Sequence, residues 1–190
     1  MASRTRKFKL AAHALPIPIE AEVSLTLLHV ADLLIRPLEE TLKTAELTHT
    51  QYNALRILRG AHRDAEQRGA RRDGESDADY HGLPCGEIAA RMITRDPDIT
   101  RLLDRLEARG LVARSRQKKD RRVVQACITA EGIQLLKKLD KPVEEMHRKQ
   151  FAHVPAANLR QLLAHLKQIR SAVAQIKACA GDNHDEVKSN

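Results

Sequence analysis

The spacing of the apolar residues changes abruptly at Gly110. Before it, two short stretches, residues 86–93 and 97–109, place their apolar side chains on one face of a helix. After it come two β-prone runs, residues 111–114 and 123–128, with charged residues between them. The sequence therefore predicts two short helices joined by a tight turn, followed by a β-hairpin with a basic tip.

Proline and glycine mark the limits of the second of these helices. Pro97 suits the first helical position, where a missing N–H costs nothing, and Asp96 suits the N-cap before it. Gly110 suits the C-terminal end, because glycine readily adopts the left-handed conformation found there. We therefore expect a helix that begins at Pro97 and stops at Gly110.

The chain before this region contains two further helical patterns. Residues 20–35 are apolar on nearly every side, which is typical of a helix that is buried all round, and Pro37 should kink or end it. The threonines within residues 47–50 are good N-caps for a second helix, which Gly60 should close. Residues 61–82 are mostly charged or small, so we expect a long mobile loop there.

The chain after the hairpin is predicted to be helical. Thr129 suits the N-cap of a helix that is interrupted near Pro142. A final helix should begin around Pro155, and its apolar seam continues as far as Ile176. The last residues, 179–190, are polar and are expected to be disordered.

The first and last helices carry apolar surface that needs a cover. A second copy of the chain is the expected cover, and packing of the last helix within its own chain is the alternative. The residues expected at this dimer interface are Leu25, Leu28, Leu159, Leu162, Leu166, Ile169 and Val173.

These patterns indicate a mostly α-helical fold with a small β-hairpin wing, a winged helix-turn-helix. The expected segments are a basic N-terminal extension at 1–18, a dimerisation helix at 19–45, a DNA-binding lobe at 46–129 that contains the flexible insert 61–82, C-terminal dimerisation helices at 130–178 and a disordered tail at 179–190.

The charge of the chain favours an anionic partner. The net charge is +8 and the sequence pI is near 9.7. Positive charge is concentrated in residues 109–122, where Asp120 is the only acid. The chain has two Tyr, two Phe and no Trp, which disfavours the folds that stack bases on aromatic side chains. The charge balance alone does not distinguish DNA from RNA or an anionic membrane. Together with the helix-turn-helix pattern and the basic hairpin, it favours double-stranded DNA as the partner.

The helix at 97–109 carries the first set of candidate DNA contacts. Its apolar side points inward, so Arg101 and Arg105 lie on the outward stripe. Arginine can donate two hydrogen bonds to O6 and N7 of guanine in the major groove. The alternative is a surface ion pair with Asp98 or Asp104, which adds little stability. The candidate contact residues are Arg95, Asp98, Thr100, Arg101 and Arg105.

The hairpin carries the second set. Its cations can lie along phosphates or enter a narrow minor groove, although a solvated charged loop is the alternative. A hydrogen-bonded pair between Asp120 and Arg122 would fix the loop. The candidate wing residues are Arg114, Arg116, Lys118, Lys119, Asp120, Arg121 and Arg122.

Few other residues are candidates for an effector, metal or redox site. His29 and Asp32 share one face of the first helix and are candidates for an effector or metal site, with a hydrogen-bonded structural pair as the alternative. Cys85, Cys127 and Cys179 lack the spacing of a zinc cluster or a disulfide framework, and Cys127 should be a small core residue. We therefore expect no metal and no cofactor.

Two broad classes of protein are disfavoured. No Gly-rich phosphate loop, GxSxG or HExxH motif occurs, so we expect no enzyme activity. Residues 1–9 are basic, but no long apolar run follows, and no segment approaches the roughly 20 apolar residues of a membrane span. A cytoplasmic protein without a signal peptide or a membrane partner is expected.

Three spaced motifs resemble those of the MarR family of transcriptional regulators. They are the run Ile99–Val112, the triplet at 120–122, and Ile-Thr-x-x-Gly at 128–132. The resemblance covers about residues 47–136, and the flanking helices agree in order. It implies a dimer whose first and last helices form the interface, and whose two winged lobes bind a pseudo-palindrome.

The resemblance also implies roles for single residues. Asp120 matches the acid that holds the wing arginine. The positions that match groove or backbone contacts are Thr100, Arg101 and Arg105 in the helix, and Arg114 and Arg122 in the wing. The long insert and the basic N-terminal extension depart from the family pattern.

The expected function is that of a sequence-specific transcriptional regulator. We expect a homodimeric repressor that is released from its operator by a small-molecule effector, as the resemblance implies. A non-specific architectural DNA-binding protein is the alternative. Oxidant-sensing relatives carry a reactive cysteine in the first helix, and this chain has none there.

Overall fold

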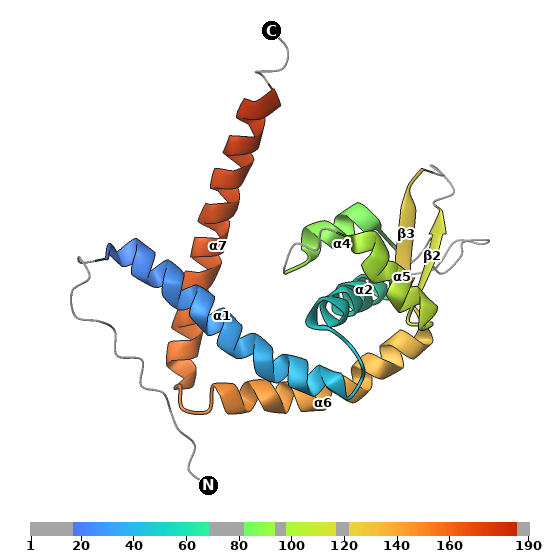
Figure 1. The fold of residues 1–190 in the computed structure, drawn as a ribbon, viewed down its shortest axis with the longest axis horizontal. Helices are drawn as coiled ribbons and strands as arrows, with labels where there is room; N and C mark the ends of the chain where they lie inside the picture. Colours follow the sequence, from blue (N-terminus) through green and yellow to red (C-terminus); the bar gives the residue numbers. More distant parts are fainter. Residues whose placement is uncertain (1–16, 69–81, 94–97, 117–121, 186–190) are drawn as a thin grey trace. The chain divides into compact units, whose positions relative to one another are not determined.

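The computed structural model describes residues 17–68, 82–93, 98–116 and 122–185, with side chains described as far as residue 176. The chain divides into two units, Met1–Met146 and His147–Asn190, and each is described by itself. In chain order the elements are α1 (Ile19–Lys43), α2 (His49–Arg68), β1 (Leu83–Pro84), α4 (Cys85–Arg91), α5 (Ile99–Ala108), β2 (Val112–Arg116), β3 (Val124–Ile128), α6 (Ala130–Gln150) and α7 (Ala156–Asp185) (Figure 1).

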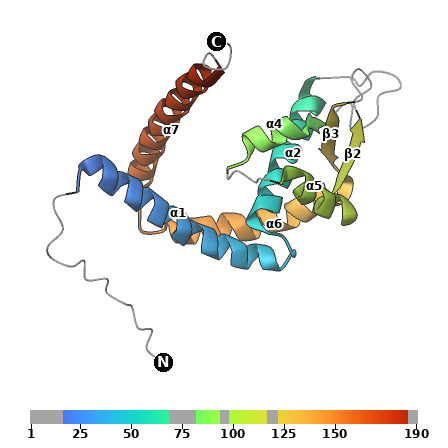
Figure 2. The same ribbon diagram turned by 45° about the horizontal axis from the view of Figure 1, so that its top comes forward.

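The fold is mostly helical and carries one small antiparallel sheet, which confirms the predicted fold class. The short helices α4 and α5 lie beside the hairpin formed by β2 and β3 (Figure 2). The strand order is β1-β3-β2, and Ala126 of β3 is flanked by Leu83 of β1 and Arg114 of β2. The strand β1, which leads directly into α4, was not predicted.

The core of the first unit is built from aliphatic side chains of every helix in it. Each helix presents one apolar stripe to the others, and burying such a side chain stabilises the fold by about 1.5–3 kcal/mol. The largest fully buried side chains are Leu42, Leu55, Leu58, Ile88, Leu103, Leu106, Leu136 and Val112. Side chains of α5, β2 and β3 all belong to this core, which holds the helix and the hairpin together.

The second helix is longer than the sequence predicted. Gly60 does not close it, because α2 continues to Arg68. Ala61 and Ala65 are buried and extend the inner face of the helix by two turns. The first part of the expected loop at 61–82 is therefore helical, and residues 69–81 lie outside the described part of the chain.

Neither proline ends its helix. Pro37 lies inside α1 and Pro142 lies inside α6. Buried residues follow each proline, Leu42 in α1 and Val143 in α6, so packing on the core holds the helix together beyond the lost hydrogen bond. The interruption that the sequence predicted near residue 142 was wrong.

The ends of α5 and α7 agree only in part with the sequence prediction. α5 begins at Ile99, and its N-cap is Asp98 rather than the predicted Asp96, which lies outside the described residues with Pro97. Gly110 has φ of +69° and Leu111 N–H donates to the Leu106 carbonyl, so the predicted C-terminal stop is confirmed. α7 continues to Asp185. The prediction of a disordered tail from residue 179 was therefore wrong for residues 179–185.

The described helices do not resemble membrane spans. Within residues 17–68, 82–93, 98–116 and 122–185, none of them combines the length and apolar character that crossing a bilayer requires.

Candidate nucleic-acid interface

The helix α5 presents two chemically different faces. Leu102, Leu103 and Leu106 are buried in the core. Thr100, Arg101 and Arg105 are exposed, on the side that the predicted outward stripe requires. The core leucines therefore hold two arginines at the surface, one helical turn apart.

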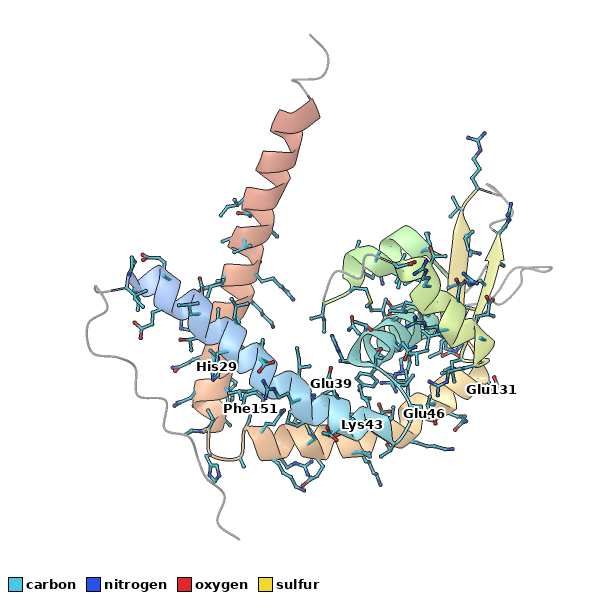
Figure 3. The ribbon with its side chains drawn as sticks, in the orientation of Figure 1. His29, Glu39, Lys43, Glu46, Glu131 and Phe151 are labelled. Carbon is cyan, nitrogen blue, oxygen red and sulfur yellow. The ribbon has the colours of Figure 1, made fainter. Side chains whose placement is uncertain are left out.

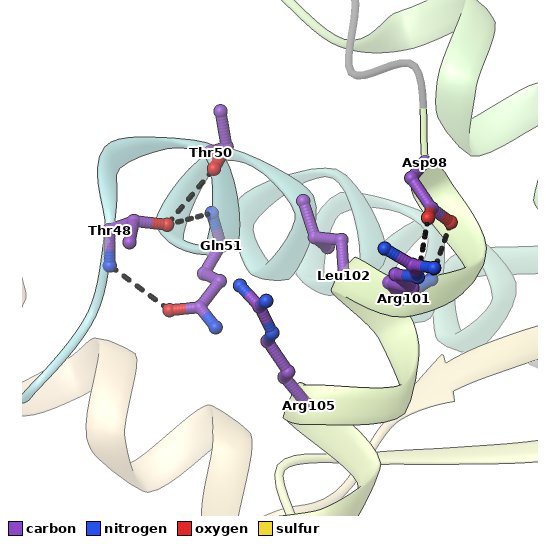
Figure 4. A pocket seen from close by; sticks show the side chains of 7 residues that line it. All are labelled: Thr48, Thr50, Gln51, Asp98, Arg101, Leu102 and Arg105. Carbon is purple, nitrogen blue, oxygen red and sulfur yellow. Dashed lines mark hydrogen bonds and ion pairs between the residues drawn. The ribbon is translucent and has the colours of Figure 1, made fainter.

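Asp98 fixes the start of this helix and also engages its first arginine. The Asp98 Oδ1 accepts a hydrogen bond of 3.0 Å from the Arg101 backbone N–H, and Oδ2 lies 2.9 Å from Arg101 Nε (Figure 4). The ion pair considered as an alternative from the sequence is thus present. Because the Arg101 side chain is 79% exposed, the pair is weak and leaves the guanidinium open to exchange with DNA.

Arg105 is in a different situation from Arg101. Among the described side chains, no hydrogen bond or ion pair engages its guanidinium. It borders a hollow of about 270 Å³ between α5 and the start of α2 (Figure 4). The hollow is lined by Thr48, Thr50, Gln51, Asp98, Arg101, Leu102 and Arg105.

The start of α2 is held by a reciprocal cap. The Thr48 backbone N–H donates to Gln51 Oε1 at 3.0 Å, and the Gln51 backbone N–H donates to Thr48 Oγ1 at 3.2 Å. The hydroxyl groups of Thr48 and Thr50 are 2.9 Å apart. The cap keeps the positive end of a 20-residue helix at the rim of the hollow, where an anion is favoured.

The wing, residues 112–128, supplies further cations next to α5. Arg116 at the end of β2 and Arg122 before β3 are exposed. The remaining candidates at the tip, Lys118, Lys119, Asp120 and Arg121, lie outside the described residues, as does Arg95. The proposed pair between Asp120 and Arg122 is therefore not described by the structure.

Arg114 has contacts that the sequence did not predict. Its side chain is 22% exposed and is held by two carboxylates of α5, at 2.5 Å from Glu107 Oε2 and 2.6 Å from Asp104 Oδ1. The hydrogen bonds that Arg114 donates to Glu107, and to a smaller extent to Asp104, raise the pKa of Arg114 above its ordinary value, against the opposing effect of burial. Asp104 and Glu107 were missed as partners, although their three-residue spacing places them on one helix face before a basic strand.

His29, labelled on α1 in Figure 3, does not form with Asp32 the hydrogen-bonded pair that was the alternative to an effector or metal site. The Asp32 carboxylate instead accepts a 2.6 Å hydrogen bond from Arg36, one turn further along α1, and both His29 and Asp32 are exposed. In the described part of the chain, no group of three or more His, Cys, Asp or Glu side chains is arranged to hold a metal ion.

The residues expected at a dimer interface lie on the surface of the single chain. In α1, Leu25 is 59% exposed and Leu28 is 70% exposed. In α7, Leu162, Ile169 and Val173 are exposed, whereas Leu159 and Leu166 are partly buried. Each of these two helices thus presents uncovered apolar side chains.

Two of the cysteines are described. Cys127 is buried in β3, as predicted for a small core residue. Cys85, at the start of α4, is partly buried, and burial raises the pKa of its thiol. A raised pKa lowers the thiolate fraction at neutral pH, so Cys85 should react slowly with oxidants.

Comparison with known proteins places this geometry in a family. The model of the MarR family matches residues 78–124. The crystal structure of a MarR transcription factor from Planctomyces limnophilus is 35% identical in sequence, with a TM-score of 0.54, over 82% of this chain and 97% of that one. The chain belongs to the MarR family.

Two further proteins are similar to this chain. The transcriptional repressor MdtR of Bacillus subtilis is 45% identical over 53 residues, which are 27% of this chain and 34% of that protein. A mutant of MarR from E. coli, solved in complex with operator DNA, has a TM-score of 0.66 at 20% identity, over 82% of this chain and 99% of that one. The match to MdtR thus spans about a third of that repressor's length.

Membership in this family gives the chain a general function. The chain is a MarR-family, DNA-binding transcriptional regulator. The exposed face of α5 and the adjoining wing are its candidate nucleic-acid interface.

Proposed function

We propose that this regulator is a homodimeric repressor that binds a pseudo-palindromic operator and is released by a small-molecule effector. The observation that carries the proposal is the outward stripe of α5, in which Arg105 borders the hollow at the start of α2 (Figure 4). The buried leucines opposite this stripe make its position a property of the core rather than of a loop.

The arrangement suits a duplex with one helix in the major groove. Arg101 and Arg105 are spaced to meet successive base pairs, and guanine is the base that arginine contacts best. A phosphate of the neighbouring backbone fits the hollow, since the start of α2 and Arg105 both favour negative charge. Arg116, exposed at the end of β2, adds a cation for the backbone or the minor groove.

A second copy of the chain would cover the apolar surface of α1 and α7. Exposed leucine and valine side chains in such numbers favour an interface, and closed two-fold dimers are the commonest arrangement of like chains. Two copies related by a two-fold axis would read two inverted half-sites about one helical turn apart.

Selection of duplexes from a random library by the purified protein tests the operator. A regulator should enrich an inverted repeat, and Arg105→Ala should lose discrimination between that repeat and a scrambled duplex. Arg116→Ala is the matched control, which should weaken both duplexes about equally. If unrelated DNA competes as well as the selected duplex at physiological salt, the protein is the architectural type instead.

Sedimentation of the purified protein tests the dimer. We expect Leu28→Glu and Val173→Glu to shift the protein toward the monomer, because each places a charge on an apolar face. Lys167→Glu, on an exposed position of α7, introduces the same side chain away from that face and should leave the dimer intact. A wild-type protein that sediments as a monomer at micromolar concentration contradicts the proposal.

Repression and effector release are tested with the gene nearest to the selected operator. Deleting the regulator should raise transcription of that gene. A ligand that raises the melting temperature of the protein should lower its affinity for the selected duplex. Ligands that stabilise the protein without changing DNA affinity would speak against effector release.

A further inference from the structure

We propose that Glu107 and Asp104 position the wing by holding Arg114, and that Arg114 acts through this clamp rather than by contacting DNA. The inference rests on the proposed DNA-binding function of α5 and the wing. It gives Arg114 a role different from the phosphate or groove contact that its place in the sequence suggests.

The clamp engages both the backbone and the side chain of Arg114. Its backbone N–H donates to Glu107 Oε1 at 3.1 Å, and its Nε donates to Glu107 Oε2 at 2.8 Å. Its Nη2 reaches Glu107 Oε2 at 2.5 Å and Asp104 Oδ1 at 2.6 Å. Because one carboxylate binds two parts of the same residue, it fixes the position of the strand as well as the direction of the side chain.

The position of Arg114 in the sheet transmits this constraint to the wing. Arg114 pairs with Ala126 of β3, and Arg116 pairs with Val124 two residues nearer the tip. Holding Arg114 against α5 therefore sets where Arg116 lies relative to Arg105. A duplex presents its grooves and phosphates at fixed spacing, so a helix and a wing that bind together need a fixed separation.

The balance of charge argues against a direct DNA contact by Arg114. Two carboxylates surround one guanidinium, and the Arg114 side chain is the least exposed of the three. Reaching a phosphate would break both ion pairs and leave Asp104 and Glu107 facing the negative backbone. Such an exchange is unfavourable. The exposed Arg116 would break no ion pair of the described residues on reaching a phosphate.

The first test uses salt. Affinity for the duplex that the wild-type protein selects from a random library is measured between about 50 and 200 mM salt. We expect Arg114→Gln to lower the affinity about tenfold with an unchanged slope of log affinity against log salt. Arg116→Gln is the matched control and should reduce the slope by about 0.9. The same reduction in Arg114→Gln would overturn the inference.

The second test removes a negative charge. If Glu107 had no positioning role, Glu107→Gln would strengthen binding to every duplex, because it removes repulsion from phosphates. We expect the opposite for the selected duplex, a loss of about tenfold, with no loss for a scrambled duplex of the same length. Stronger binding to both duplexes by Glu107→Gln would overturn the inference.

A double variant separates the clamp from simple loss of folding. Glu107→Gln combined with Arg114→Gln should cost no more selected-duplex affinity than Arg114→Gln alone, because both changes remove one interaction. Retained binding to the scrambled duplex shows that each variant is folded. Losses that add fully in the double variant contradict the clamp.

Failure of the proposed function and failure of the clamp give different results. If the wild-type protein selects no sequence, the proposed function fails. If the wild type is selective and Glu107→Gln binds the selected duplex as the wild type does, only the clamp fails.

Discussion

Arg59 on α2 and Asp140 on α6 are joined by an ion pair although they are 81 residues apart in the sequence. The Arg59 Nη1 donates to both carboxylate oxygens, each at 2.9 Å. The Arg59 side chain is only 13% exposed, whereas that of Asp140 is 44% exposed. The pair therefore joins two helices of the first unit at the edge of its core.

Removing one partner of this pair should destabilise the protein. Asp140→Asn leaves the poorly exposed Arg59 without its counter-charge, so we expect a loss of about 1–2 kcal/mol in the free energy of unfolding. Urea titration monitored by circular dichroism measures the loss. Lys141→Gln removes an exposed charge from the next position of α6. It is the control and should change the unfolding free energy by less than about 0.5 kcal/mol. Equal effects of the two substitutions would show that the Arg59 pair has no special weight.

Tyr52 should make stability fall at high pH. Burial raises the pKa of its phenol, and this outweighs the lowering by Arg56 and Arg59. In the unfolded chain the phenol titrates at about 10, so above that pH the unfolded state loses the proton first and folding becomes less favourable. The difference in unfolding free energy between wild type and Tyr52→Phe should be constant from about pH 7 to 9 and should change in favour of the variant above about pH 10. A pH-independent difference would contradict the raised pKa.

Gly132 and Gly60 make a matched pair of glycine substitutions. A Cβ on Gly132 would collide with the Leu111 carbonyl oxygen and lie 2.7 Å from Ile128 Cγ1, whereas one on Gly60 would meet nothing within 4 Å. We expect Gly132→Ala to lower the unfolding free energy by about 1–3 kcal/mol and Gly60→Ala to raise it by about 0.5–1 kcal/mol. Thermal melting of both variants checks the two signs. A neutral Gly132→Ala variant would mean that α6 can shift away from Leu111 and Ile128 at little cost.

Asp98 combines two roles that substitutions can separate. Asp98→Ala removes the cap on the Arg101 backbone N–H and should cost about 1 kcal/mol of stability. Asp98→Asn keeps a capping oxygen while removing the charge that pairs with Arg101, so its stability should stay close to wild type. Chemical denaturation distinguishes them, and equal losses would show that the ion pair, not the cap, stabilises the start of α5.

Apolar spacing predicted most of the helices and the hairpin. Ile99, Leu102, Leu103 and Leu106 repeat at helical intervals, so their burial follows from periodicity alone. The errors occurred where a local signal competed with packing. Gly60 is a poor helix residue, but the buried Ala61 and Ala65 beyond it outweigh its cost of about 1 kcal/mol.

The surface of α5 was only partly predictable. The spacing of Arg101 and Arg105 gave their outward direction, because one helix face has to be buried. The capture of Arg114 by Glu107 depends on how β2 returns beside α5, and no periodicity within either element encodes that approach. The capping role of Asp98 was missed because Pro97 favoured a helix start two residues earlier.

The short strand β1 has a wider consequence. Leu83 and Pro84 pair with β3, which also pairs with β2, so the segment that leads into α4 and the wing share one ladder of backbone hydrogen bonds. The segment that leads into α4 and the hairpin are thereby held in one sheet. In the proposed dimer, substitutions that alter the response to an effector without altering base preference are accordingly expected outside residues 82–128, in the helices that set the distance between the two DNA-binding lobes.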